Sequence, residues 1–320
     1  MRLLQRRSRR PVQGLDIGLR SNGRRLVLPY PKLPHILIAG LTGSGKSGVI
    51  NSLLYALAGL QHVALVGVDL KRVELAPWRS RFTALEVDGS GVDGLFGRLR
   101  GEIERREQLL ESLGERAWRT ELGPWLVFII DEFAELTVTD LNRLIEVSQL
   151  PKSRETDQEI SDMMKAARHS LGLRSGILES FARKCRALGV TMTIATQYPT
   201  SDVVDTQVRS QFEIRLMCRV ASKEQVKVGL GGGMEESFDV RDISPLQRGS
   251  FAVAGLETKL FTARASWIDD ATVAARVAET AHLRIAPEVL FGGGAELVAV
   301  PVPAVPVAVD SVSDDGALWL

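Results

Sequence analysis

The chain has 320 residues, of which 45% are hydrophobic, enough for one large α/β domain or two smaller ones. Its 40 Lys and Arg nearly balance 39 Asp and Glu, so the net charge of +1 does not by itself indicate a polyanionic partner. Two cysteines exclude a disulfide framework, and no apolar run approaches the ~20 residues of a membrane-spanning helix. The Arg-rich start also lacks the apolar core of a signal peptide. We therefore expect a cytoplasmic protein, and work at a membrane would need recruitment to its cytoplasmic face by a separate membrane protein.

The charges are distributed unevenly between the two ends. Residues 1–13 form a basic arm with five arginines in the first ten residues, whereas residues 285–320 carry five acids and neither Lys nor Arg. The arm fits either contact with a polyanion or a solvated terminus. Repeated Gly and Pro in 285–320 predict an extended, flexible tail.

The elements between these ends follow an alternating pattern. DIGLRSNGRRLVLP predicts a small β-hairpin that turns at Asn22-Gly23. Strands are then predicted at 35–39, 62–68, 125–130, 191–196, 213–220 and 250–254, and helices at 46–58, 94–113 and 178–188. This alternation predicts an α/β fold with a mostly parallel sheet covered by helices on both faces and ligands bound at the carboxyl ends of the strands. Residues 137–177 read either as a helical insertion or as a partly ordered one.

The stretch AGLTGSGKSG, residues 39–48, has the spacing G-x-x-x-x-G-K-[ST] between a predicted strand and a predicted helix. Glycines there let backbone N–H groups face an anion at a helix start. In this interpretation Lys46 reaches the β- and γ-phosphates of ATP, and the Ser47 hydroxyl holds Mg²⁺. The alternative is a Gly-rich turn that binds nothing. The candidate nucleotide-binding residues are Gly40, Thr42, Gly43, Ser44, Gly45, Lys46 and Ser47.

A second polar site is predicted in WLVFIIDEFAEL, residues 125–136, where an apolar strand ends in two acids. Asp131 would hold the Mg²⁺ shell, and Glu132 could polarise the water that attacks the phosphate. Such a pair favours hydrolysis over transfer to another substrate, although a strand can also simply end in acids. The strand at 191–196 runs into Gln197, whose amide could sense the γ-phosphate or be an ordinary turn amide.

Several stretches together resemble the motor domain of FtsK/SpoIIIE-type DNA translocases. They are KLPHILIAGLTGSGKSGVINSLL, VGVDLKRVEL, ERREQLLESLG, LVFIIDEFAEL, ARKCRALGVTMTIATQYP and EIRLMCRVASKEQ, in family order and approximate spacing. The resemblance spans about residues 14–262, so we delimit a motor domain at 14–284. It implies a RecA-like P-loop core, assembled as a ring, expected to be a hexamer, around double-stranded DNA with ATP bound between neighbours.

The resemblance also implies roles for single residues. It places Lys46 and Ser47 on phosphate and Mg²⁺, makes Asp131 and Glu132 the metal and water carboxylates, and makes Gln197 the γ-phosphate sensor. Arg215 in EIRLMCRV matches a family arginine that faces the neighbouring subunit's nucleotide, which implies an arginine finger in trans. Its alternatives are Arg209 and Arg219.

Other matches and one departure complete the resemblance. Asp69 and Lys71 in GVDLKRVEL match a family Asp-x-Lys stretch and are interpreted as coupling elements. The family's ATQRP is ATQYP here, with Tyr198 in place of Arg. The compact architecture further resembles transfer proteins of actinobacterial conjugative plasmids and integrative elements.

The sequence thus predicts an ATP-driven translocase of double-stranded DNA. Candidate contacts to DNA phosphates are Lys71, Arg72, Arg79, Arg81, Lys152, Arg154 and the arm from Arg6 to Arg10. The alternatives are a protein-export ATPase like those of type VII secretion, a P-loop kinase acting on a small molecule, and a catalytically inactive ring scaffold.

Overall fold

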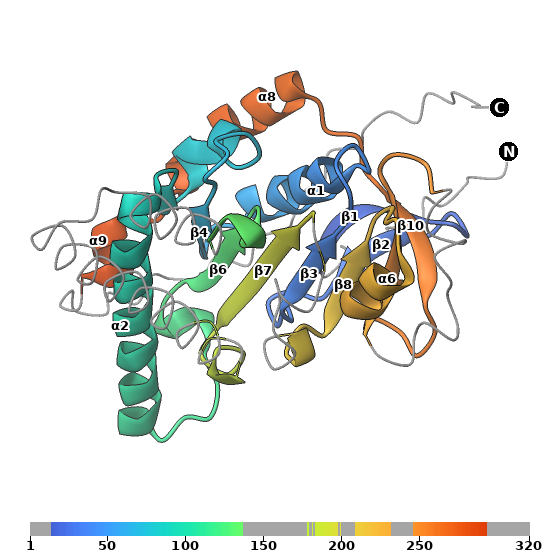
Figure 1. The fold of residues 1–320 in the computed structure, drawn as a ribbon. Helices are drawn as coiled ribbons and strands as arrows, with labels where there is room; N and C mark the ends of the chain where they lie inside the picture. The colour runs from blue at the N-terminus through green and yellow to red at the C-terminus, as the bar shows by residue number, and fades with distance from the viewer. Residues whose placement is uncertain are drawn as a thin grey trace, which may run out of the picture.

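The computed structural model describes residues 14–136, 178, 181, 183–197, 199, 209–231 and 246–292. The described strands form one ten-stranded sheet in the order β2-β1-β10-β9-β8-β3-β7-β6-β4-β5 (Figure 1). The basic arm, the 137–177 insertion, Tyr198 and the tail beyond 292 lie outside the described residues. Within the described part of the chain, none of the helices has the length and apolar character needed to cross a bilayer.

One half of the sheet is parallel. Its strands are β3 (Ile36–Ala39), β4 (Val63–Val68), β5 (Ala84–Glu86), β6 (Trp125–Ile130), β7 (Val190–Thr196) and β8 (Ile214–Met217). Every residue of β3, β4, β6 and β7 is buried, as expected for strands covered on both faces. Strand β7 lies between β3 and β6, so three neighbouring strands deliver the P-loop, Gln197 and the two acids to one edge of the sheet.

The other half is antiparallel and consists of β1 (Leu15–Arg20), β2 (Arg25–Leu28), β9 (Ser250–Ala254) and β10 (Phe261–Ala265). Strands β1 and β2 form the predicted hairpin, and Gly23 in its turn has a φ of 76°. Strand β9 joins the halves by pairing antiparallel to β8. The backbone N–H of Ala265, at the end of β10, donates to the carbonyl of Gly249, which precedes β9.

The described helices are α1 (Lys46–Ala58), α2 (Gly89–Leu113), α6 (Lys223–Leu230), α8 (Asp270–Thr280) and α9 (Pro287–Phe291), with short 3-10 turns η1 (Ala76–Arg81), η2 (Thr120–Leu122) and η4 (Ala281–Leu283). Helix α1 packs on β1, β3 and β10, whereas α6 packs on β8 and β3. Helix α2 stands at the β5 side of the sheet beside α9 (Figure 1).

Side chains along β9 point alternately to the two faces of the sheet. Phe251 and Val253 join the large core cluster that includes the apolar side of α1. Ala252 and Ala254 point to the other face, where they pack with Val226 of α6 in a smaller cluster. Successive strand residues face opposite sides, so helices cover both faces of the sheet, and the predicted α/β architecture is confirmed.

Some element boundaries differ from the prediction. Helix α2 begins at Gly89 rather than Gly94, because the Asp88 side chain accepts a hydrogen bond from the Ser90 N–H and caps the first turn despite its glycines. Strands β5 and β10 and helices α6 and α8 were not predicted. The tail predicted as extended from residue 285 first forms helix α9, in which Leu290 is 1% exposed.

Candidate active site

The P-loop connects β3 to α1, as the glycine spacing predicts. Gly45 caps α1 with a φ of 99°, a left-handed conformation that favours glycine. A Cβ on Gly45 would lie 2.1 Å from the backbone nitrogen of Gly249, and one on Gly40 would lie 2.6 Å from Cβ of Cys218. The Gly249 N–H also donates to the Ser44 carbonyl at 3.0 Å. The loop therefore keeps a narrow backbone cradle at a helix N-terminus, which fits the phosphates of a nucleotide.

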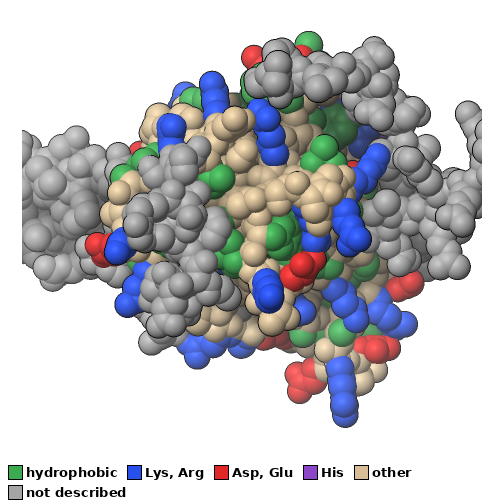
Figure 2. All heavy atoms as spheres, turned by 90° about the vertical axis from the view of Figure 1, so that its right-hand side faces the viewer, with side chains coloured by type: hydrophobic (Ala, Val, Ile, Leu, Met, Phe, Trp, Pro, Cys, Tyr) green, Lys and Arg blue, Asp and Glu red, His purple; other side chains and the backbone are tan. Residues whose placement is uncertain are grey.

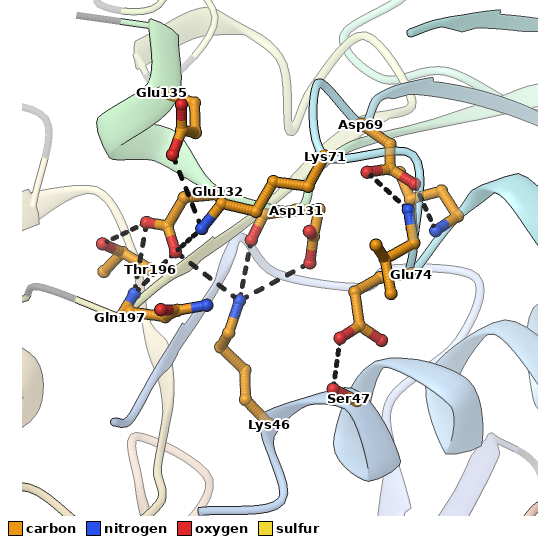
Figure 3. A network of polar contacts seen from close by, with 12 residues as sticks. Lys46, Ser47, Asp69, Lys71, Glu74, Asp131, Glu132, Glu135, Thr196 and Gln197 are labelled. Atoms are coloured by element: carbon orange, nitrogen blue, oxygen red, sulfur yellow. Dashed lines mark hydrogen bonds and ion pairs between the residues drawn. The ribbon is translucent and has the colours of Figure 1, made fainter. Parts of the chain in front are cut away.

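Lys46 is buried at the centre of the site, with 5% of its surface exposed. Its Nζ donates to the carbonyl oxygen of Asp131 at 3.0 Å and lies 3.5 Å from the Asp131 carboxylate (Figure 3). Its distance to Oε2 of Glu132 is 3.9 Å. The fold thus brings Lys46 and the two predicted acids together, with an ammonium group that can contact phosphate oxygens.

Asp131 follows β6 directly and is 2% exposed. Burial raises its pKa from the ordinary 3.8 to about 6, because a charge is unfavourable away from water. Lys46 opposes this rise, whereas the neighbouring carboxylates of Glu74, Asp69 and Glu132 add to it. Asp131 is therefore a buried acid among like charges, and a cation bound there would favour its ionised form.

Glu132 is held from several sides. One carboxylate oxygen accepts a hydrogen bond from the Thr196 hydroxyl at 2.9 Å, and both accept from the Gln197 N–H at 3.2 and 3.1 Å. Lys71 Nζ lies 3.6 Å from Oε2 (Figure 3). The Gln197 side-chain oxygen in turn accepts from the Thr42 hydroxyl of the P-loop at 2.8 Å. The predicted Gln197 thus lies between the P-loop and the acid that would orient water.

The turn after β4 contributes side chains to this site. Asp69 is fully buried, and its carboxylate accepts from the backbone N–H groups of Val73, Leu75 and Ala76 at 3.3, 2.9 and 3.1 Å. This anchoring orients Lys71 toward Glu132. The coupling role of Asp69 and Lys71 stays a prediction, but the anchoring of the turn is a clear structural role for Asp69.

Sequence reasoning missed Glu74, which lies in the same turn. The Ser47 hydroxyl donates a hydrogen bond to the Glu74 carboxylate (Figure 3). These residues are 27 positions apart, so spacing alone gives no hint of the contact. The only available signal is the buried strand that precedes the turn, because it delivers the turn to the same sheet edge as the P-loop.

Arg215 lies apart from this cluster. Its guanidinium donates to the carbonyl of Phe212 at 3.1 Å and to that of Arg209 at 2.9 Å, both of which precede β8. Arg219 is exposed after β8, and its carbonyl accepts from the P-loop N–H of Leu41 at 2.9 Å. A single chain does not test whether Arg215 acts on a neighbouring subunit's nucleotide. The trans role of Arg215, and the choice among Arg209, Arg215 and Arg219, therefore stay predictions.

One candidate DNA contact is wrong. Arg81 is fully buried and donates to the carbonyls of Ala58, Leu60 and Val63. Burial removes it from any DNA surface, and its hydrogen bonds give it a structural role. Arg72 and Arg79 are exposed, as a phosphate contact requires, whereas Lys152, Arg154 and the arm lie outside the described residues.

A phosphate cradle, a buried lysine and a strand-end acid pair at the carboxyl edge of a parallel sheet are the parts that nucleotide hydrolysis requires, and the chain is a P-loop ATPase. The model of the FtsK/SpoIIIE family matches residues 2–120. The chain belongs to the FtsK/SpoIIIE family.

Two curated relatives illustrate the match. The DNA translocase SftA of Bacillus subtilis (strain 168) is 29% identical over 241 residues, covering 73% of this chain and 23% of SftA. The DNA translocase FtsK of Borreliella burgdorferi is 30% identical over 228 residues, covering 69% of this chain and 27% of that protein. The chain therefore spans only a minor part of these relatives' length.

Solved structures share the fold at lower identity. The pCW3 conjugation coupling protein TcpA, solved with ATPγS, superposes with a TM-score of 0.65 at 22% identity, covering 87% of this chain and 73% of TcpA. The cytoplasmic domain of the type VII secretion ATPase EccC of Thermomonospora curvata has a TM-score of 0.61 at 20% identity, covering 89% of this chain and 33% of EccC. At such identities the superpositions establish the fold alone.

Proposed function

We propose that this protein is an ATP-driven translocase of double-stranded DNA that works as a ring. The observation that carries the proposal is the alignment with proteins named DNA translocases, which covers 73% of this chain for SftA and 69% for the Borreliella FtsK. The polar cluster in Figure 3 supports hydrolysis as the source of energy, because it combines a phosphate-binding lysine with two carboxylates.

Each residue of the cluster has a proposed role. Lys46 binds the β- and γ-phosphates, and Glu132 orients the attacking water, since hydrogen bonds from Thr196 and Gln197 fix its carboxylate. Gln197 also contacts Thr42 and is therefore suited to sense the γ-phosphate. Ser47 and Asp131 would hold Mg²⁺, which neutralises charge on the phosphate oxygens when bound.

Basic surface supports the choice of DNA as the partner. Figure 2 views the side of the molecule that carries β1, β2 and β10, and Lys and Arg side chains are spread over the described part of that face, with acidic side chains among them. Exposed basic residues in and near these strands are Arg24, Arg25, Lys259 and Arg264. Contacts of this type bind phosphates without reading sequence and weaken with salt.

The test is ATP hydrolysis with and without long double-stranded DNA at two salt concentrations, with Lys46→Ala as the blank. We expect strong stimulation that falls as salt rises. Hydrolysis that is indifferent to DNA, in protein shown to form rings, would reject the DNA motor and favour the export ATPase. Transfer of conjugative plasmids or integrative elements, as the process served, stays a prediction.

The ring proposal assigns Arg215 to the neighbouring subunit's nucleotide. Its guanidinium would have to leave the carbonyls of Phe212 and Arg209 to reach a partner. In mixed rings, subunits with Arg215→Ala should partly rescue subunits with Lys46→Ala, because one type of interface keeps both residues. Mixed rings without any rescue would refute the trans role and leave the ATP site itself untouched.

A further inference from the structure

The turn between β4 and η1 is unusually well fixed for a surface connection. Asp69 is buried at its start and binds the backbone of three later residues of the turn. Such bonds to a charged acceptor hold the backbone in one conformation. Glu74 lies within this anchored segment and is partly buried, so its direction is set by the fold.

Glu74 points at the first turn of α1. The Ser47 hydroxyl donates to its carboxylate, and the Glu74 charge contributes to raising the pKa of Asp131 (Figure 3). Among the described residues, Glu74 makes no ion pair with Lys or Arg, whereas Lys46 and Lys71 lie beside the Asp131 and Glu132 carboxylates. The Glu74 carboxylate and the Ser47 hydroxyl thus meet beside Asp131, and among the described residues only Lys46 pairs with Asp131 while no Lys or Arg pairs with Glu74.

We propose that Glu74 is a positioning residue for the Mg²⁺ that accompanies ATP. By accepting the Ser47 proton in a hydrogen bond, Glu74 directs the hydroxyl lone pairs away from itself and makes them available to a metal. A residue that hydrogen-bonds a metal ligand without touching the metal orients that ligand and strengthens metal binding. Magnesium commonly combines one or two carboxylates with phosphate and water oxygens, which suits Asp131 as a direct ligand with Glu74 behind Ser47.

This inference rests on the proposed magnesium–ATP site and adds a residue to it. A second possibility is that the Glu74 carboxylate blocks the Ser47 hydroxyl until a bound nucleotide displaces the carboxylate. The two roles predict different effects on nucleotide binding. A metal-positioning carboxylate makes nucleotide binding more responsive to Mg²⁺. A blocking carboxylate opposes nucleotide binding, and its removal would strengthen binding in the presence of Mg²⁺.

The test is the affinity for a fluorescent ATP analogue, measured in EDTA and across a Mg²⁺ titration. Glu74→Gln changes charge at nearly constant shape, and Glu74→Ala removes the acceptor. Glu104→Gln is the matched control, because Glu104 is exposed on α2 and pairs only with Arg100 among the contacts described. Thermal unfolding of each variant checks that the fold is kept.

We expect both Glu74 variants to bind the analogue in EDTA at least as well as wild type. The Mg²⁺ concentration that half-saturates the enhancement of binding should rise roughly tenfold or more for Glu74→Ala, the usual effect of losing an outer partner of a metal ligand, and less for Glu74→Gln, whose amide oxygen can still accept from Ser47. The control should titrate like wild type. An unchanged Mg²⁺ titration, or tighter binding with Mg²⁺ present, would overturn the role of Glu74. Wild-type binding that ignores Mg²⁺ would instead refute the underlying magnesium site.

Discussion

Asp131→Asn should stabilise the nucleotide-free protein at neutral and alkaline pH while abolishing ATP hydrolysis. Asp131 is 2% exposed and lies near the carboxylates of Glu74, Asp69 and Glu132. Its charge is therefore unfavourable before a metal or nucleotide binds, although Lys46 compensates in part. Asn keeps the shape of the side chain and removes that charge.

The sign and size of the effect follow from the pKa. Asp131 titrates at about 6 in the folded protein, against an ordinary value of 3.8. Because the folded pKa is the higher one, the stabilising contribution of the protonated acid is complete below pH 3.8 and is lost as the pH rises through about 6. At about 1.4 kcal/mol for each pKa unit, the loss amounts to about 3 kcal/mol at pH 8.

The assay is urea unfolding of wild type and Asp131→Asn in EDTA without nucleotide, from pH 4 to pH 8. We expect the variant to gain about 3 kcal/mol in unfolding free energy at pH 8 and little at pH 4. Asp270→Asn is the control, since Asp270 is exposed at the start of α8 and should change stability by less than about 1 kcal/mol. A gain that does not depend on pH, or no gain at pH 8, would refute the reasoning.

Three other substitutions test the site and its support. Gly45→Ala should abolish nucleotide binding and cost at least about 1 kcal/mol of stability, because its φ is 99° and its Cβ would strike Gly249. Thr196→Val should slow hydrolysis roughly tenfold at saturating ATP, equivalent to about 1.4 kcal/mol, since Glu132 loses a hydrogen bond of 2.9 Å. Arg106→Met should cost about 3–5 kcal/mol in urea unfolding, because it removes a fully buried guanidinium that pairs with Glu102 and donates to the carbonyls of Leu188, Gly189 and Pro124.

Each of these substitutions has a matched control in the chain. Gly48→Ala places its Cβ in open space, and Arg100→Met removes only an exposed partner on the same helix. Thr193→Val lies on the same strand as Thr196 and removes a buried hydroxyl that has no hydrogen-bond partner among the described residues. Controls that are as damaging as the test variants would contradict the reasons given, as would a Thr196→Val enzyme that hydrolyses ATP at the normal rate.

The sequence predicts those parts of the fold in which the local residue pattern is compatible with only one type of element. The apolar run from Trp125 to Ile130 has clear ends, and it forms β6 with the predicted bounds. The glycines and Lys46 likewise mark the start of α1. The two short strands β5 and β10 lack such runs, because their pairing partners rather than their own composition stabilise them.

Side-chain direction and burial are what the sequence could not supply. Arg81 looks like a surface charge, yet three carbonyls satisfy it in the interior. Glu74 lies in a turn whose orientation depends on Asp69, so its contact with Ser47 emerges only when the whole turn is built. The acid pair was predictable, because neighbouring parallel strands must end at the same edge.

Two main-chain hydrogen bonds connect the P-loop to the outer strands. The Gly249 N–H donates to the Ser44 carbonyl, and the Ala265 N–H donates to the Gly249 carbonyl. No side chain takes part in either bond, so shortening a side chain does not remove this connection, whereas a Cβ added at Gly45 would strike Gly249. Replacing single amides by esters would expose its contribution, since that exchange deletes a donor and leaves every side chain unchanged.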